Sequence, residues 1–203
     1  MTDTTLRVGS VEGEAAARPM PPATIVPPAG IPIVAVVLAG LVAAIVSNKL
    51  WALDFFHVAG GALWTGVDLF VGLLIGPILR RISVQARVEF SARFMPKMLL
   101  LMPTLVIVTL ASGFQLARLL GNLNTAAPMH GWIVASFVIV GVLTIIAIGV
   151  LEPANLAVLF ELRKPKPDGE LIGRLMRRFV MTAGIIGGAQ VATLVIMTRL
   201  ASG

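Results

Sequence analysis

The sequence predicts an all-α membrane protein, a polytopic bundle of about five transmembrane helices. Its composition is the first reason: 57% of the 203 residues are hydrophobic and 13% are charged, with a mean hydropathy of +0.94. A soluble domain is nearer half apolar and about a quarter charged. The second reason is that the apolar residues form long blocks, close to the roughly 20 residues that a helix needs to cross a bilayer. The third is that Lys and Arg gather in the loops between the blocks.

The charge and the cysteine count exclude several classes of protein. A net charge of +6 would suggest nucleic acid in a soluble protein. Here the basic residues flank apolar blocks, so we expect them to set membrane topology and expect no nucleic-acid partner. The absence of cysteine excludes disulfides, thiolate metal sites and Cys-ligated iron–sulfur clusters.

The chain divides into a tail and a membrane domain. Residues 1–30 are polar, rich in proline and without a helical apolar period, so we expect a disordered cytoplasmic tail. It lacks the basic start and apolar core of a signal peptide. Residues 31–203 are predicted to form the five-helix transmembrane domain.

Each predicted span corresponds to one apolar block. The spans cover about 31–47, 55–79, 98–117, 131–152 and 179–198. The first is short, and the fourth has an apolar continuation past Pro153 to about 162. Pro103 and Pro153 are predicted to kink their helices. Two small-xxx-small pairs are predicted to allow close helix packing: Gly72 with Gly76, and Gly184 with Gly188.

The distribution of Lys and Arg predicts the orientation. Two loops hold most of them: Arg80, Arg81, Arg87, Arg93 and Lys97 in the first, and Arg163, Lys164, Lys166, Arg174, Arg177 and Arg178 in the second. With five spans both loops lie on the side of the N-terminus. The opposite side receives only Lys49, Arg118 and Arg199. The positive-inside rule therefore predicts a cytoplasmic N-terminus and a C-terminus on the outer side of the membrane, which is the periplasmic side if the membrane is a bacterial inner membrane.

The second span, within LDFFHVAGGALWTGVDLF, carries polar groups that hydrocarbon penalises. At about 100° per residue, Asp54, His57, Trp64 and Asp68 share one helix face, with Gly61 beside it. The opposite side carries lipid-compatible residues: Phe55, Leu63, Phe70 and Leu73. We therefore expect the polar face to turn toward the bundle interior or an aqueous cavity.

The acidic residues each allow more than one interpretation. Asp68 lies about 16 Å below His57, near mid-membrane. It is either neutral and hydrogen-bonded to Gln115, Thr109 or Gln190, or it handles protons or ions. Asp54 near the helix end is solvated, acts as an N-cap, or orients His57. Glu152 is expected near the inner interface, either partly hydrated at a kink or serving proton entry.

His130, just before the fourth span, is predicted at a depth similar to His57. Alone it would be an interfacial residue. Two neutral imidazoles at one depth could ligate a haem b, with a gap at Gly60 and Gly61 admitting the porphyrin and Trp64 and Trp132 against it. The same histidines, with Asp54 and Met129, could instead hold copper. Trp51 and Trp132 are alternatively part of an aromatic belt.

The motif HVAGGALWTGVDLFVG, a basic loop and a helix containing ASGFQLA resemble the CopD-like and HemJ-like group of small bacterial membrane proteins. The resemblance covers about residues 50–120. It implies haem b bound through His57, with Trp64 and Gly66 as further motif residues. The intramembrane lysine of the HemJ type and a Met-rich copper tract have no counterpart in this chain.

These observations lead to a functional hypothesis. The chain is expected to be a redox subunit of a larger membrane complex, binding haem b near the outer face and passing electrons between a periplasmic partner and the quinone pool. His57 and His130 would be the ligands, Asp54 would orient His57, and Asp68 would handle protons. Copper binding or transport is the first alternative, and a structural subunit of a membrane complex is the second. The pattern identifies no catalytic residue and leaves enzymatic activity open.

Overall fold

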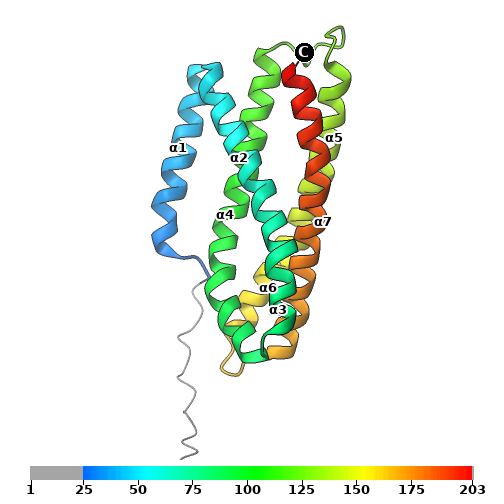
Figure 1. Ribbon diagram of the computed structural model, residues 1–203. Helices are drawn as coiled ribbons and strands as arrows, with labels where there is room; N and C mark the ends of the chain where they lie inside the picture. The colour runs from blue at the N-terminus through cyan, green and yellow to red at the C-terminus, as the bar shows by residue number, and fades with distance from the viewer. Residues whose placement is uncertain (1–24, 203) are drawn as a thin grey trace, which may run out of the picture.

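The structure is a computed structural model that describes residues 25–202, and within this range all regular secondary structure is helical (Figure 1). The helices are α1 (Ile31–Ser47), α2 (Leu50–Phe70), α3 (Gly76–Arg81), α4 (Val84–Leu119), α5 (His130–Ile146), α6 (Glu152–Leu162) and α7 (Gly169–Ser202). Because α2 runs on into α3 and α5 into α6, the chain forms five helices that are long and apolar enough to cross a membrane. The predicted all-helical fold, with five helices capable of spanning a membrane, is confirmed. Most of the predicted tail lies outside the described residues.

Two ends of the bundle are distinguished by their connections. The α1–α2 turn, the α4–α5 loop and the C-terminus lie together at what we call the C-terminal end (Figure 1). The α3–α4 and α6–α7 connections lie at the other end, which we call the basic end because both predicted basic loops gather there.

Helices α4 and α7 begin well before the apolar blocks from which their spans were predicted. Ser83 caps α4, because its hydroxyl oxygen accepts a hydrogen bond from the amide of Ala86 at 3.2 Å. Asp168 accepts hydrogen bonds from the first amides of α7, those of Glu170 at 2.9 Å and Leu171 at 3.0 Å. Such caps satisfy amides that have no partner within the helix. The helices therefore continue through charged segments that water, rather than lipid, solvates.

Two π-helical turns each lie just before a proline at the start of the next helix. The turn Val71–Ile75 precedes Pro77 at the start of α3, and the turn Ala147–Leu151 precedes Pro153 at the start of α6. Proline removes an amide and crowds the carbonyl four residues earlier, and a local π turn accommodates both effects. The fourth span therefore continues to Leu162, as its apolar continuation past Pro153 indicated.

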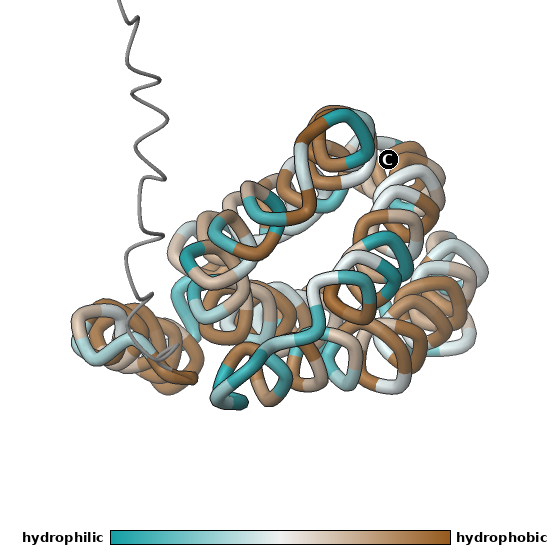
Figure 2. The backbone as a smooth tube through the Cα atoms, turned by 90° about the horizontal axis from the view of Figure 1, so that it is seen from below, coloured by the Kyte–Doolittle hydropathy of each residue, from teal (hydrophilic) through white to brown (hydrophobic). Residues whose placement is uncertain are grey.

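The core of the bundle lies among α2, α4, α6 and α7. Its most buried side chains include Met95, Val158, Leu159, Ile172, Met176 and Ile186. Helix α1 packs mainly on α4 and α2 through a separate small cluster of Ala44, Leu53 and Leu116. Viewed along the helices, α1 lies beside the bundle rather than within it (Figure 2).

A close helix contact joins the segment after α2 to α7. A Cβ atom on Gly72 would collide with the backbone of Gly184, and one on Gly76 would lie 3.4 Å from a methyl carbon of Val180. Gly72 from the first predicted small-residue pair therefore packs against Gly184 from the second. Gly188, by contrast, has nothing within 4 Å of the position of an added Cβ.

Candidate functional site

A cavity of about 370 Å³ opens between α2, α4, α5 and α7 toward the C-terminal end. Its volume lies within the range of roughly 300–1,000 Å³ that is typical of small-molecule sites. Most of its wall is apolar, from residues such as Val58, Phe114, Ile133, Phe137, Val140 and Leu143. The polar groups on the wall include Asp54, His57, Trp64, Gln190 and Thr193. An apolar cavity with a few convergent polar groups is typical of a ligand or cofactor site.

The polar and apolar faces predicted for α2 explain why its polar side chains lie on the cavity wall. Trp64 and Asp68 are 4% and 2% exposed, respectively. The opposite face is exposed on the outer surface of the bundle through Phe55, Leu63, Phe70 and Leu73. The polar stripe therefore turns inward, as the sequence predicted, and three of its members line the cavity.

His57 is held in one orientation by α4. Its Nδ1 lies 2.9 Å from the carbonyl oxygen of Thr109. Since a carbonyl only accepts hydrogen bonds, Nδ1 carries the proton and the Nε2 lone pair of the neutral ring stays available. The ring lies against Gly113, where an added Cβ would be 2.6 Å from the ring carbon Cε1. Histidines that ligate metals commonly donate their other N–H to a carbonyl in this way.

Of the roles considered for Asp54, the structure agrees with a solvated side chain and not with an N-cap or a partner of His57 Nδ1. Helix α2 begins at Leu50 with Lys49 at the N-cap position, so Asp54 is not the N-cap. The group that bonds Nδ1 of His57 is the Thr109 carbonyl rather than the Asp54 carboxylate. Asp54 instead lines the cavity with an exposed side chain.

Asp68 lies below the cavity and is hydrogen-bonded across to α7. The Nε2 atom of Gln190 donates to its Oδ2 at 3.4 Å. Helix α7 approaches closely here, since a Cβ on Gly187 would lie 3.1 Å from the Cβ of Asp68. Of the three partners considered from sequence, the structure selects Gln190. Gln115 donates instead to Asn48, and the Thr109 hydroxyl donates to the Leu105 carbonyl.

Three buried polar atoms on the cavity wall lack a hydrogen-bond partner: Nε1 of Trp64, Oε1 of Gln190 and Oγ1 of Thr193. Trp64 Nε1 lies near the Asp68 carboxylate but without hydrogen-bond geometry. Within residues 25–202 these are all the buried side-chain atoms of this kind. Each costs about 1–3 kcal/mol if it stays unpaired. The two on α7, in Gln190 and Thr193, point to polar atoms of a ligand or water inside the cavity.

The structure does not bring His130 to the cavity wall. His130 begins α5 at the same end of the bundle as His57, but it is not among the residues that line the cavity. Its Nδ1 lies 3.2 Å from the carbonyl oxygen of Asn122 in the preceding loop. Trp132 does not line the cavity either, and with Trp51 it is exposed on the outer surface.

The two glycines that follow His57, Gly60 and Gly61, differ in their surroundings. A Cβ on Gly60 would lie 2.8 Å from the hydroxyl oxygen of Thr109 and 3.0 Å from Val108, so α4 fills the space beside it. The predicted gap at Gly60 is therefore wrong. Gly61 does line the cavity.

Glu152 does not lie at the end of its helix, where the predicted fourth span ended. The prediction placed it near the interface because the fourth span was expected to end there. The span continues to Leu162, which places Glu152 about 15 Å from that end. Its side chain is half-buried at the first turn of α6, directly after the π turn.

Some residues of the cavity wall were not singled out from the sequence. Gly113 positions His57, and Met197 and Thr193 contribute the α7 side of the wall. The glycine of ASGFQLA was a visible signal for close packing. Nothing in an apolar helix indicates beforehand that a particular methionine faces a cavity.

The donor set favours a group bound at one or two points over an ion held in a cage. Within residues 25–202, no group of three or more His, Cys, Asp or Glu side chains is placed to hold a metal ion. Histidine and thioether groups do occur on one wall, in His57 and Met197. These can serve as axial ligands to a haem, which needs no further protein donors.

The fold and the cavity define the class: a multi-pass helical membrane protein with a ligand-sized cavity inside its bundle. Comparison of the chain with models of protein families, with curated proteins and with solved structures found no match. The resemblance to the CopD-like and HemJ-like group thus stays a prediction from the sequence motif.

Proposed function

We propose that this protein is a redox subunit of the bacterial inner membrane that binds haem b in the cavity at the C-terminal end. The observation that carries the proposal is His57, whose ring is fixed by the Thr109 carbonyl with Nε2 available on the wall of an apolar cavity. In the proposed orientation the basic end lies in the cytoplasm, and the cavity is near the outer face.

Different residues of the cavity would contribute different interactions to haem binding. His57 would provide an axial ligand, and the Thr109 carbonyl would keep its ring in the correct tautomer. Met197 lines the same cavity and is the better candidate for a second ligand than His130. The apolar wall would exclude water, while the unpaired atoms of Gln190 and Thr193 would bond polar groups of the ligand.

Bound haem b would supply one-electron transfer at a potential set by its ligands and surroundings. Electrons would pass between a periplasmic partner and the quinone pool, with other membrane subunits alongside. Asp68, hydrogen-bonded to Gln190 beneath the cavity, would hold or release a proton as the charge above it changes.

The visible spectrum of the purified protein tests this proposal. We expect the dithionite-reduced protein to show the α-band of a b-type haem, and we expect haemin added to the apoprotein to restore it. A colourless sample that neither contains haem nor takes up haemin would contradict the proposal. Copper in that sample, measured by elemental analysis, would support copper binding; its absence would support a structural role.

A further inference from the structure

A second cavity, of about 510 Å³, lies at the opposite end of the bundle from the proposed haem site. It is formed by α3, the start of α4 and the first half of α7. Four arginines line it: Arg80, Arg87, Arg174 and Arg177. The single acidic residue on its wall is Glu170. The wall therefore carries a clear excess of positive charge.

Arg87 is held in place as part of the wall. Its Nε donates to the carbonyl oxygen of Leu79 at 3.1 Å, and one terminal nitrogen donates to the carbonyl oxygen of Ile82 at 3.4 Å. Its other terminal nitrogen lies close to Gly173, where an added Cβ would be 2.6 Å away. Carbonyl groups orient the guanidinium but leave its charge uncompensated. A fixed arginine loses little side-chain freedom when it binds an anion.

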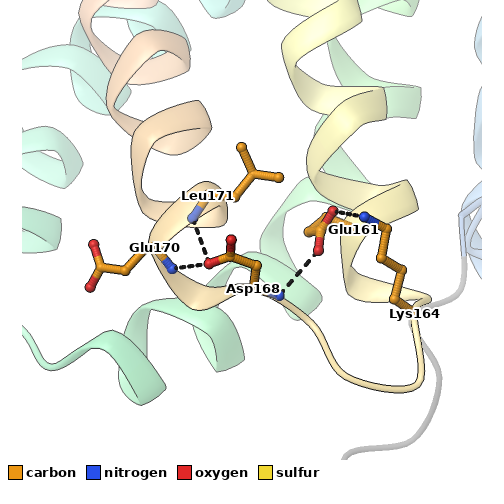
Figure 3. Close-up of polar contacts among 5 residues, drawn as sticks. All are labelled: Glu161, Lys164, Asp168, Glu170 and Leu171. Carbon is orange, nitrogen blue, oxygen red and sulfur yellow. Dashed lines mark hydrogen bonds and ion pairs between the residues drawn. The ribbon is translucent and has the colours of Figure 1, made fainter.

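Two further acidic residues near this end of the bundle, Glu161 and Asp168, use their carboxylates in other contacts (Figure 3). Glu161 pairs with Lys164 at 2.5 Å and accepts a hydrogen bond from the amide of Asp168 at 3.1 Å. Asp168 caps α7, and the amides of Leu171 and Glu170 hold the pKa of its carboxyl below its usual value. The ion pair found among residues 25–202 joins Glu161 to Lys164. None of the four arginines takes part in it. No carboxylate of residues 25–202 therefore lies at ion-pair distance from the arginines of the cavity.

The remainder of the wall is apolar and leads toward the membrane. Gly72, Gly76, Val180 and Met181 line this part, and the Met181 side chain is exposed on the outer surface. The two glycines allow α7 to pack closely against this part of the wall. A cavity that is cationic at the end of the spans and apolar toward the bilayer fits a molecule with a phosphate at one end and hydrocarbon at the other.

We propose that this cavity binds the phosphate group of an anionic membrane phospholipid, with its arginines on the phosphate and the apolar wall against the start of an acyl chain. Guanidinium groups bind phosphate oxygens through charge-assisted, often bidentate, hydrogen bonds. Basic cavities between transmembrane helices are a recurrent form of lipid headgroup site. The inference is independent of the proposed haem site, which lies at the other end of the bundle.

Lipid binding to the full-length protein tests this inference. The purified protein in neutral detergent is titrated with dioleoylphosphatidylglycerol, with dioleoylphosphatidylcholine or with inorganic phosphate, and bound lipid is counted by native mass spectrometry. We expect phosphatidylglycerol to bind at least about tenfold more tightly than phosphatidylcholine, the effect of one or more charge-assisted hydrogen bonds. We expect inorganic phosphate at millimolar concentration not to displace it.

Matched variants show whether the cavity is responsible. Arg80 and Arg177 have exposed side chains, so Arg80→Gln with Arg177→Gln should leave the fold intact and reduce phosphatidylglycerol affinity by about tenfold or more. Arg81→Gln with Arg178→Gln removes the same two charges from the neighbouring positions of α3 and α7, outside the cavity wall, and should leave the affinity unchanged; Arg178→Gln alone should do so as well. Equal binding of the two lipids, or an equal loss in the Arg178→Gln protein, would overturn the inference. Displacement by inorganic phosphate would overturn its assignment to a lipid.

Discussion

His57 is oriented by backbone atoms of α4 rather than by another side chain. The Thr109 carbonyl fixes one ring nitrogen, and the absence of a side chain at Gly113 leaves room for the ring. This arrangement makes the ring position depend on the packing of α2 against α4. It also means that no side-chain substitution at position 109 removes the hydrogen bond to Nδ1.

The substitution Gly113→Ala tests this arrangement at the residue scale. The new methyl group would lie 2.6 Å from Cε1 of His57, so the ring must move or the two helices must separate. Overpacking of this kind costs about 1–3 kcal/mol of stability, and we expect weakened or altered haem ligation. The measurements are thermal unfolding in detergent and the visible spectrum.

Gly141→Ala is the matched control, because nothing lies within 4 Å of an added Cβ at that glycine of α5. An unchanged spectrum and unchanged stability in the Gly113→Ala protein would show that the ring is not held against α4.

At the scale of elements, the π turn after α2 packs closely against α7, backbone against backbone. Gly72 meets the backbone of Gly184, and a backbone cannot move aside as a side chain can. This contact also forms part of the wall of the basic cavity, through Gly72 and Gly76.

Gly72→Ala should therefore destabilise the protein by about 1–3 kcal/mol, because α7 must move away from α2 to admit the methyl group. Gly188→Ala, at an exposed position of α7 with nothing near the added Cβ, should change stability by less than about 0.5 kcal/mol. Thermal or denaturant unfolding in detergent measures both. Equal stability of the two variants would mean that the helices do not approach at Gly72.

The elements also show how far the sequence could be interpreted. Hydropathy located all five membrane helices, because each apolar block must be covered by lipid or protein. It missed the charged starts of α4 and α7, where caps and water support the helix. The helical period placed His57, Trp64 and Asp68 on one inward face. The wall contributed by Gly113, Thr193 and Met197 depends on which helices become neighbours, and the sequence contains no simple signal for that.

At the scale of the whole molecule, the two cavities lie at opposite ends of the bundle. The cationic cavity is at the basic end, and the apolar cavity with His57 is at the C-terminal end. The positive-inside rule would place the first at the cytoplasmic surface and the second near the outer surface.

Cysteine labelling in intact cells tests this orientation, and the chain has no native cysteine to interfere. Cysteines are introduced at Ala86, at the basic end, and at Thr125, at the C-terminal end. Both positions are exposed. With a membrane-impermeant thiol reagent we expect Thr125→Cys to react and Ala86→Cys to be protected until the cells are lysed. The opposite pattern would place the proposed haem site on the cytoplasmic side.

The most direct test of the central claim is the haem content of two single variants. His57 lies on the cavity wall, whereas His130 lies at the same end but off the wall, so each serves as the control for the other. We predict that His57→Ala removes the low-spin b-type spectrum and that His130→Ala retains it at wild-type occupancy. Full haem occupancy and an unchanged spin state in the His57→Ala protein would contradict the assignment of His57 as the axial ligand.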